Sequence, residues 1–223
     1  SIVHYAHDDE SDRDFLFLHV REPHNMGEKY CESIAGLLMH FNVAEYCRVG
    51  GMYDSVPHTR SLLVTGTLTD EQENKAKGMV SPRRSTYQGP TSIVNLVTET
   101  MIEHEISTTN LMAHLPQYVQ LHEDHMGASR ITEVLCAMYD LPRSLADPAR
   151  GQQQYREINS AVETNPEVSD LIKQLEAYYD RVLAGPDEPD DQQEHFAPDV
   201  ERFLREMGDR LEGPEEEDSD DVD

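Results

Sequence analysis

Three adjacent side chains at positions 58–60 have the types that proton transfer and anion binding require. His58, Thr59 and Arg60 stand in the stretch GGMYDSVPHTRSLLVTG, between two short apolar runs. An imidazole moves protons near neutral pH, and a guanidinium holds a carboxylate or phosphate through two parallel hydrogen bonds. Glycines before the triplet permit unusual backbone angles and Pro57 stiffens the loop, so the three side chains are expected to point in a defined direction.

Two interpretations of this triplet are open. In the functional one, the loop follows a strand, where open α/β sheets place their binding loops, and Arg60 grips an anion while His58 exchanges a proton. In the structural one, Arg60 satisfies carbonyls at the base of the loop and His58 caps a chain end. No nucleophile or carboxylate pair accompanies the triplet, which favours the structural interpretation.

A second loop, YQGPTS at 87–92, holds further binding candidates in Gly89, Pro90 and Thr91. Backbone N–H groups at the start of the following helix can bind a small anion. The stretch lacks the repeated glycines and the lysine of a phosphate loop. Helix capping by Thr91 or Ser92 is therefore the favoured explanation.

A histidine-rich run, AHLPQYVQLHEDHMG, contains residue types that bind metals. His122 and His125 lie beside Glu123 and Asp124, but they form no HExxH pair. Polar clusters between periodic segments are usually solvated loops. We therefore expect no metal site and no cofactor.

The charge of the chain disfavours several classes of partner. Its net charge is -26 over 223 residues, with six acids in 186–199 and eight in 212–223, and neither stretch contains Lys or Arg. Such a surface repels phosphate backbones and anionic membranes. No apolar run approaches the ~20 residues of a membrane span. The three cysteines lack CxxC spacing, which indicates reduced thiols in a cytoplasmic protein.

Hydrophobic periodicity predicts the elements that position these loops. Strands are expected at 15–20, 45–51, 61–66 and 106–116, and a polar loop at 67–88. Helices are expected over 26–41, 89–105, 151–164 and 166–184, with another that contains Ile131 and stops near Pro142. Strands separated by an amphipathic helix pair in parallel, because a parallel return needs a crossover. The sequence thus predicts an α/β fold with a mostly parallel sheet.

The composition divides the chain into five expected parts. Residues 1–148 form the α/β domain and 149–185 a helical appendage. They are followed by an acidic linker at 186–199, a short amphipathic helix at 200–211 and a disordered acidic tail at 212–223.

Four stretches resemble one known family in their order. They are VPHTRSLLVTGT at 56–67, YQGPTSIVNLV at 87–97, NLMAHLPQYV at 110–119 and ASRITEVLCAMYDLP at 128–142. Over residues 14–142 the chain resembles the proteasome assembly chaperone family, and more closely its bacterial branch. The resemblance implies a three-layer α/β/α fold similar to that of purine nucleoside phosphorylases, with further strands upstream. It also implies oligomerisation and, in eukaryotic and archaeal relatives, help in assembling proteasome subunits.

The family supplies no catalytic residues to carry over, so the resemblance marks the candidates only as parts of signature loops. The chain departs from the family pattern at Ser92, where glycine is common, and at Gln117, where histidine is common. It ends in DDVD rather than in the hydrophobic-tyrosine type of motif with which such chaperones dock on the proteasome. That docking mode is therefore not supported.

Two functions follow from these observations. We expect a non-enzymatic, homo-oligomeric interaction or assembly protein, with a proteasome-related partner as the resemblance implies. The alternative is a phosphorylase- or hydrolase-like enzyme acting on a small anionic or sugar-like ligand. In that enzyme Arg60 holds the anion, His58 is the general acid or base, and amides near Gly89 assist.

Overall fold

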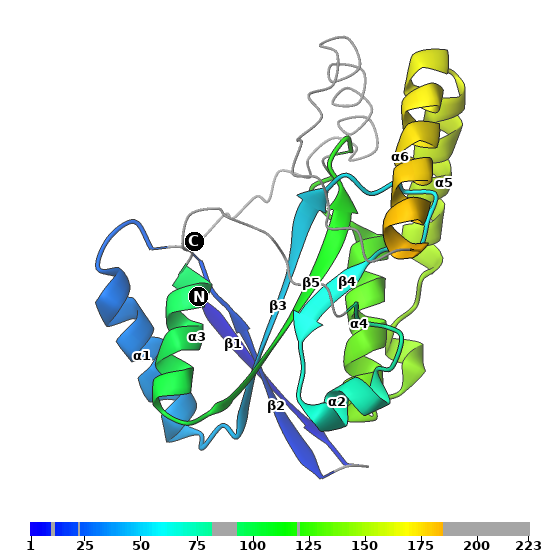
Figure 1. The fold of residues 1–223 in the computed structure, drawn as a ribbon. Coiled ribbons are helices and arrows are strands. Elements are labelled where there is room, and N and C mark those ends of the chain that lie inside the picture. The colour runs from blue at the N-terminus through cyan, green and yellow to red at the C-terminus, as the bar shows by residue number, and fades with distance from the viewer. Residues whose placement is uncertain (10–11, 22, 82–92, 120, 185–223) are drawn as a thin grey trace, which may run out of the picture. The chain divides into compact units, whose positions relative to one another are not determined.

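The computed structural model describes residues 1–9, 12–21, 23–81, 93–119 and 121–184 (Figure 1). Its elements are β1 (Ile2–Asp8), β2 (Arg13–His19), α1 (Gly27–His40), β3 (Glu45–Asp54), β4 (Val64–Thr67), α2 (Asp70–Lys75), α3 (Ile93–Glu103), β5 (Ser107–Pro116), α4 (His125–Tyr139), a 3-10 turn η1 (Arg143–Leu145), α5 (Ala149–Glu163) and α6 (Pro166–Ala184). The linker, short helix and tail expected after residue 185 lie outside the described residues. No helix in the described ranges has both the length and the apolar character that a membrane crossing needs.

Contacts divide the chain into two compact units. Unit 1 consists of Ser1–Gly50, Thr65–Leu111 and Ala137–Leu141. Unit 2 takes the remaining stretches, Gly51–Val64, Met112–Cys136 and the chain from Pro142 onward. The domain boundary expected between residues 148 and 149 stays a prediction.

The three-stranded sheet has the order β3-β5-β4. β3 and β5 run in the same direction, and the Gln117 N–H beyond β5 donates to the Asp54 carbonyl at the end of β3 at 3.1 Å (Figure 1). β4 runs the opposite way, and before it the Leu63 carbonyl accepts the His114 N–H at 2.9 Å. The expected α/β class with C-terminal helices is confirmed, and the sheet is mixed.

The first two strands form a sheet of their own. β1 pairs with β2 in antiparallel register, from Ile2 opposite His19 to Asp8 opposite Arg13. The expectation that the strand at 15–20 pairs in parallel across the helix that follows is therefore wrong. Antiparallel strands need only a short reversal, and the acidic segment between the two strands is long enough for one.

A short helix, α2, occupies part of the polar loop expected at 67–88. The Gln72 N–H donates to Thr69 Oγ1 at 3.4 Å, and the Thr69 N–H donates to Gln72 Oε1 at 3.0 Å. These reciprocal bonds form a capping box, which satisfies backbone donors that the first turn of a helix leaves free. The loop expectation is wrong over Asp70–Lys75 because these polar residues cap and continue a helix.

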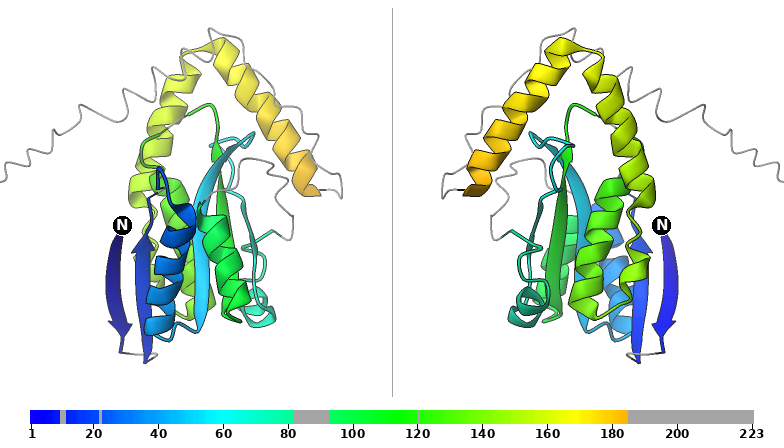
Figure 2. Two further views of the ribbon diagram at one scale, coloured as in Figure 1. Left: turned by 90° about the vertical axis from the view of Figure 1, so that its left-hand side faces the viewer. Right: turned by 90° about the vertical axis from the view of Figure 1, so that its right-hand side faces the viewer.

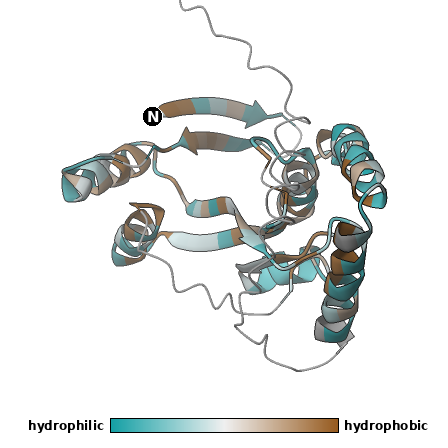
Figure 3. Cartoon of the chain, turned by 90° about the horizontal axis from the view of Figure 1, so that it is seen from above, coloured by the Kyte–Doolittle hydropathy of each residue, from teal (hydrophilic) through white to brown (hydrophobic). Residues whose placement is uncertain are grey.

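The core of unit 1 lies between α1 and α3. Both helices carry apolar and polar residues on different sides, and they lie side by side (Figures 1 and 3). The buried residues of this core are Cys31, Ile34, Ala35, Leu38, Ile93, Val97 and Met101. Another side of α3, which carries Asn95, Thr98, Glu99 and Ile102, lines a pocket.

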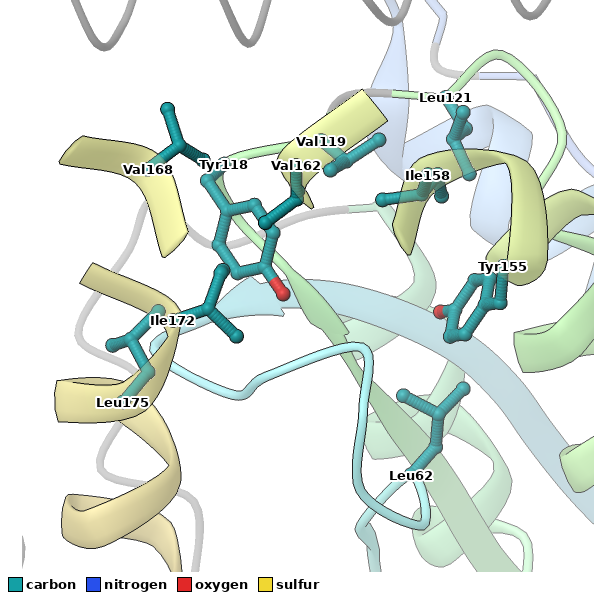
Figure 4. Close-up of a cluster of buried hydrophobic side chains, with 10 residues drawn as sticks. All are labelled: Leu62, Tyr118, Val119, Leu121, Tyr155, Ile158, Val162, Val168, Ile172 and Leu175. Atoms are coloured by element: carbon teal, nitrogen blue, oxygen red, sulfur yellow. The ribbon is translucent and has the colours of Figure 1, made fainter. Parts of the chain in front are cut away.

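The core of unit 2 is built around α5 and α6. The two helices form a V that turns at Thr164 and Asn165 (Figure 2). Asn165 begins α6 as expected, because its side-chain oxygen accepts the Val168 N–H at 3.4 Å. Ten buried residues form the cluster, namely Leu62, Tyr118, Val119, Leu121, Tyr155, Ile158, Val162, Val168, Ile172 and Leu175. Figure 4 shows Tyr118 between side chains that come from the two helices.

Two helical glycines allow a matched test of this packing. A Cβ at Gly151 in α5 would lie 2.6 Å from the backbone of Met126, whereas a Cβ at Gly36 in α1 meets nothing within 4 Å. We expect Gly151→Ala to destabilise the protein by about 1–3 kcal/mol through overpacking. Gly36→Ala should stabilise it by about 0.5–1 kcal/mol, because alanine loses less backbone entropy in a helix. Urea unfolding of both variants measures the difference, and equal effects would contradict the close approach of α5 to Met126.

Candidate functional site

The loop that carries the His-Thr-Arg triplet follows β3 directly. Its first residues are fixed to the end of β5, because Gln117 donates to Ser55 Oγ at 3.1 Å and His114 Nδ1 lies 2.6 Å from Asp54 Oδ2. Val56 and Pro57 are buried, so the chain enters the interior of unit 2 before it reaches the triplet.

His58 is buried, with 5% of its surface exposed, and it is held by Tyr118. The Tyr118 hydroxyl accepts the backbone N–H of His58 at 2.7 Å and lies 2.7 Å from Nδ1 of the same residue. The direction of the second bond depends on which ring nitrogen of His58 carries the proton, because the hydroxyl can donate one hydrogen bond and accept two. The other ring nitrogen of His58, Nε2, is buried and has no hydrogen-bond partner among the described residues.

Burial determines the charge state of this pair. It lowers the pKa of His58 from 6.5 to about 4, although the Glu176 carboxylate acts in the opposite direction. Burial also raises the pKa of the Tyr118 hydroxyl above its usual value. At neutral pH both rings are uncharged.

Arg60 extends from the same loop to α6. Its Nε and Nη2 donate to the two oxygens of Asp180 at 3.0 and 2.9 Å, and Nη1 donates to Glu176 Oε1 at 3.0 Å. The Thr59 hydroxyl donates to the same Glu176 oxygen at 2.5 Å. These bonds lower the pKa of Asp180 and raise that of Arg60. Every guanidinium nitrogen thus contacts a carboxylate of α6.

The residues after the triplet complete the attachment. The Tyr179 hydroxyl on α6 donates to the Ser61 carbonyl at 2.6 Å. Leu62 is buried in the cluster shared by α5 and α6 (Figure 4). The loop therefore has a polar side bound to α6 and an apolar residue packed in the core of unit 2.

The structure brings His58, Thr59 and Arg60 together with α6, whereas Gly89, Pro90 and Thr91 lie outside the described residues. Whether any of the six binds a ligand or forms an interface stays a prediction.

In the histidine-rich run, Asp124 begins α4 by accepting the Gly127 N–H at 2.7 Å. Its other oxygen accepts the Tyr155 hydroxyl at 2.8 Å. No group of three or more His, Cys, Asp or Glu residues in the described ranges is placed to hold a metal ion.

Sequence reasoning missed the partners of the triplet. Tyr118, Glu176 and Asp180 lie 58 to 120 residues away from it, well beyond the reach of local patterns. One signal was available, since Glu176 and Asp180 are four residues apart and therefore share a face of α6. A pair of acids on one helical face is a natural partner for an arginine, but nothing in the sequence indicates which arginine.

The model of the PAC2 family matches residues 1–163. The chain belongs to the PAC2 family. The match includes the loop with the triplet and α5, and it ends before α6. The helix that binds Arg60 thus lies beyond the part of the chain that matches the PAC2 model. No curated protein matches the chain significantly.

Solved structures share the PAC2 fold of this chain. A Corynebacterium glutamicum protein of unknown function is 19% identical with a TM-score of 0.71, and 81% of this chain covers 66% of that one. The Mycobacterium tuberculosis homologue of the proteasome-assembly chaperone is 20% identical with a TM-score of 0.63, covering 76% of this chain and 71% of the other. PbaB of Pyrococcus furiosus, an archaeal proteasome activator, is 17% identical with a TM-score of 0.54, covering 72% and 70%. This PAC2 chain spans just under two thirds of the length of the Corynebacterium protein.

The buried state of His58 predicts a specific loss of stability in acid. In the unfolded chain this imidazole binds a proton with a pKa near 6.5, whereas in the folded protein its pKa is about 4. The free energy of unfolding therefore has its full contribution from His58 above pH 6.5 and decreases as the pH falls from 6.5 to 4. The loss attributable to His58 is about 3 kcal/mol. In His58→Asn, whose amide oxygen can still accept from Tyr118, this part of the pH dependence should disappear.

Urea unfolding between pH 4 and pH 7 measures this difference. His104→Asn, which removes an exposed histidine of unit 1, is the control and should follow the wild type. Parallel pH dependence in the wild type and His58→Asn would contradict the burial of a neutral imidazole.

The ion pairs of Arg60 predict that α6 is held by the loop. Arg60→Gln should accelerate amide hydrogen exchange in α6 severalfold, since it removes the contacts to Glu176 and Asp180. Lys173→Gln is the matched control, because among the described residues Lys173 pairs with Asp170 of its own helix and with no residue of the loop. The difference between the variants should shrink as salt is added, because salt screens exposed charges. Unchanged exchange in Arg60→Gln would contradict a role of its ion pairs in holding α6.

Proposed function

We propose that this PAC2 protein is a non-enzymatic, cytoplasmic, homo-oligomeric protein that binds another protein and assists its assembly. The observation that carries the proposal is that the guanidinium of Arg60 is bound by Glu176 and Asp180. All of its guanidinium nitrogens bind carboxylates of α6, so the side chain best suited to grip a substrate anion serves to position a helix.

The state of His58 supports the same proposal. A general acid or base works best with a pKa near the operating pH. The pKa of His58 is about 4, and its Nδ1 is occupied by the Tyr118 hydroxyl. The described contacts therefore give no support to the phosphorylase- or hydrolase-like alternative.

The nature of the partner is proposed from the PAC2 family. Its solved neighbours include a proteasome-assembly chaperone homologue and a proteasome activator. Proteasome subunits are accordingly the first partners to test. The helix pair α5–α6 is the proposed contact surface, because the loop commits three neighbouring residues to hold α6 in place.

The test is affinity purification of the full-length protein from its own cytoplasm, with mass spectrometry and light-scattering mass determination. We expect a partner in near-stoichiometric amount that is retained by Lys173→Gln and weakened at least about fivefold by Arg60→Gln, as for loss of an orienting charge pair. Light scattering of the purified protein should show more than one copy.

A wild type that retains no partner would contradict the proposal. So would turnover of a small metabolite that is lost in Arg60→Gln and kept in Lys173→Gln, which would establish the enzyme alternative.

A further inference from the structure

A polar pocket of about 370 Å³ lies within unit 1. It is lined by one side of α3, by Arg48 of β3, by Thr67 of β4 and by residues 108–110 of β5. This volume falls in the range of small-molecule sites. The side of α3 that faces it consists of Asn95, Thr98, Glu99 and Ile102, and these positions follow helical spacing.

Arg48 lines this pocket, and no carboxylate among the described residues forms an ion pair with it. Its Nη1 donates to Asn95 Oδ1, which is a neutral acceptor. Its Nε is buried and has no hydrogen-bond partner among the described residues. A guanidinium has five N–H donors, and burying one without an acceptor is unfavourable. The neutral Asn95 leaves the charge of the guanidinium without a counter-ion among the described residues, and a carboxylate is the group that matches its geometry best.

Glu99 supplies the opposite charge one helical turn away. Residues four apart on a helix are neighbours on its surface, so Glu99 lies beside Asn95, the residue that Arg48 contacts. Within the ranges that the structure describes, no cation, Arg48 included, forms an ion pair with the Glu99 carboxylate. A cation and an anion thus line one pocket close together without compensating each other.

We propose that this pocket binds a small zwitterion of the α-amino acid class. Arg48 holds its carboxylate and Glu99 its ammonium group. Thr67, Thr108 and Asn110 also line the pocket and carry polar side chains, and Ile102 provides an apolar contact for the ligand side chain. This proposal is independent of the protein partner proposed above, because the pocket shares no residue with the triplet loop or α6.

The experiment is a thermal-shift screen of the full chain against the standard L-amino acids, followed by calorimetric titration. We expect at least one to bind with a Kd at or below about 1 mM. The N-acetyl and the carboxamide derivative of that amino acid should each bind about tenfold more weakly, because each lacks one charged contact.

Two variants assign the charges. Glu99→Gln should remove the penalty of N-acetylation, and Arg48→Gln should remove the penalty of amidation. Glu103→Gln, on the same helix but outside the pocket, and Arg21→Gln, an exposed arginine, are the controls and should bind as the wild type does. If Arg48→Gln fails to fold, Glu99→Gln on the exposed side of α3 still decides the matter.

The proposal is overturned if no amino acid binds at about 1 mM. It is equally overturned if both derivatives bind as tightly as the free amino acid, or if Glu99→Gln leaves the penalty of N-acetylation unchanged.

Discussion

The attachment of the triplet loop to α6 is the contact on which the architecture of unit 2 depends. A helix of this length is stable mainly through packing of its apolar side, and α6 packs on α5 and on the segment around Tyr118. The loop adds bonds from Arg60 and Thr59 and an acceptor at Ser61, all on one side of α6. Because the arginine fork fits a carboxylate in one orientation, these bonds fix the rotation of the helix as well as its position.

Burial and side-chain partners in unit 2 determine the state of the His-Thr-Arg triplet. An exposed His-Thr-Arg triplet would offer a proton carrier and a cation to a ligand. In this fold the chain enters the interior at Val56, so the imidazole of His58 loses its charge and takes a tyrosine hydroxyl as its partner. The arginine that follows returns toward the surface, where the acids of α6 neutralise it.

A contrast between two arginines is the reason that we propose a small ligand for the pocket of unit 1. Arg60 is compensated by two carboxylates, so a further anion would compete with bonds that already exist. Arg48 is half-buried and meets a neutral amide, so its charge remains available to an incoming anion. The two arginines differ in the side chains that accept their hydrogen bonds, and only the folded chain brings these side chains together.

The sequence by itself determined the elements whose signals are local. The strands at 45–51 and 106–116, the helices over 151–164 and 166–184, and the cap at Asn165 follow from periodicity and turn chemistry within a few residues. The sequence signal for the start of α2, the Thr-x-x-Gln pattern of Thr69 and Gln72, is equally local, but the polar composition of 67–88 predicted a loop instead. Only the tertiary structure decided that β2 pairs with β1. It also decided that Tyr118 forms a hydrogen bond with His58, and that Glu176 and Asp180 form ion pairs with Arg60. The last two pairings join residues 60 to 120 positions apart, so no local pattern assigns His58 to Tyr118 or Arg60 to Glu176 and Asp180.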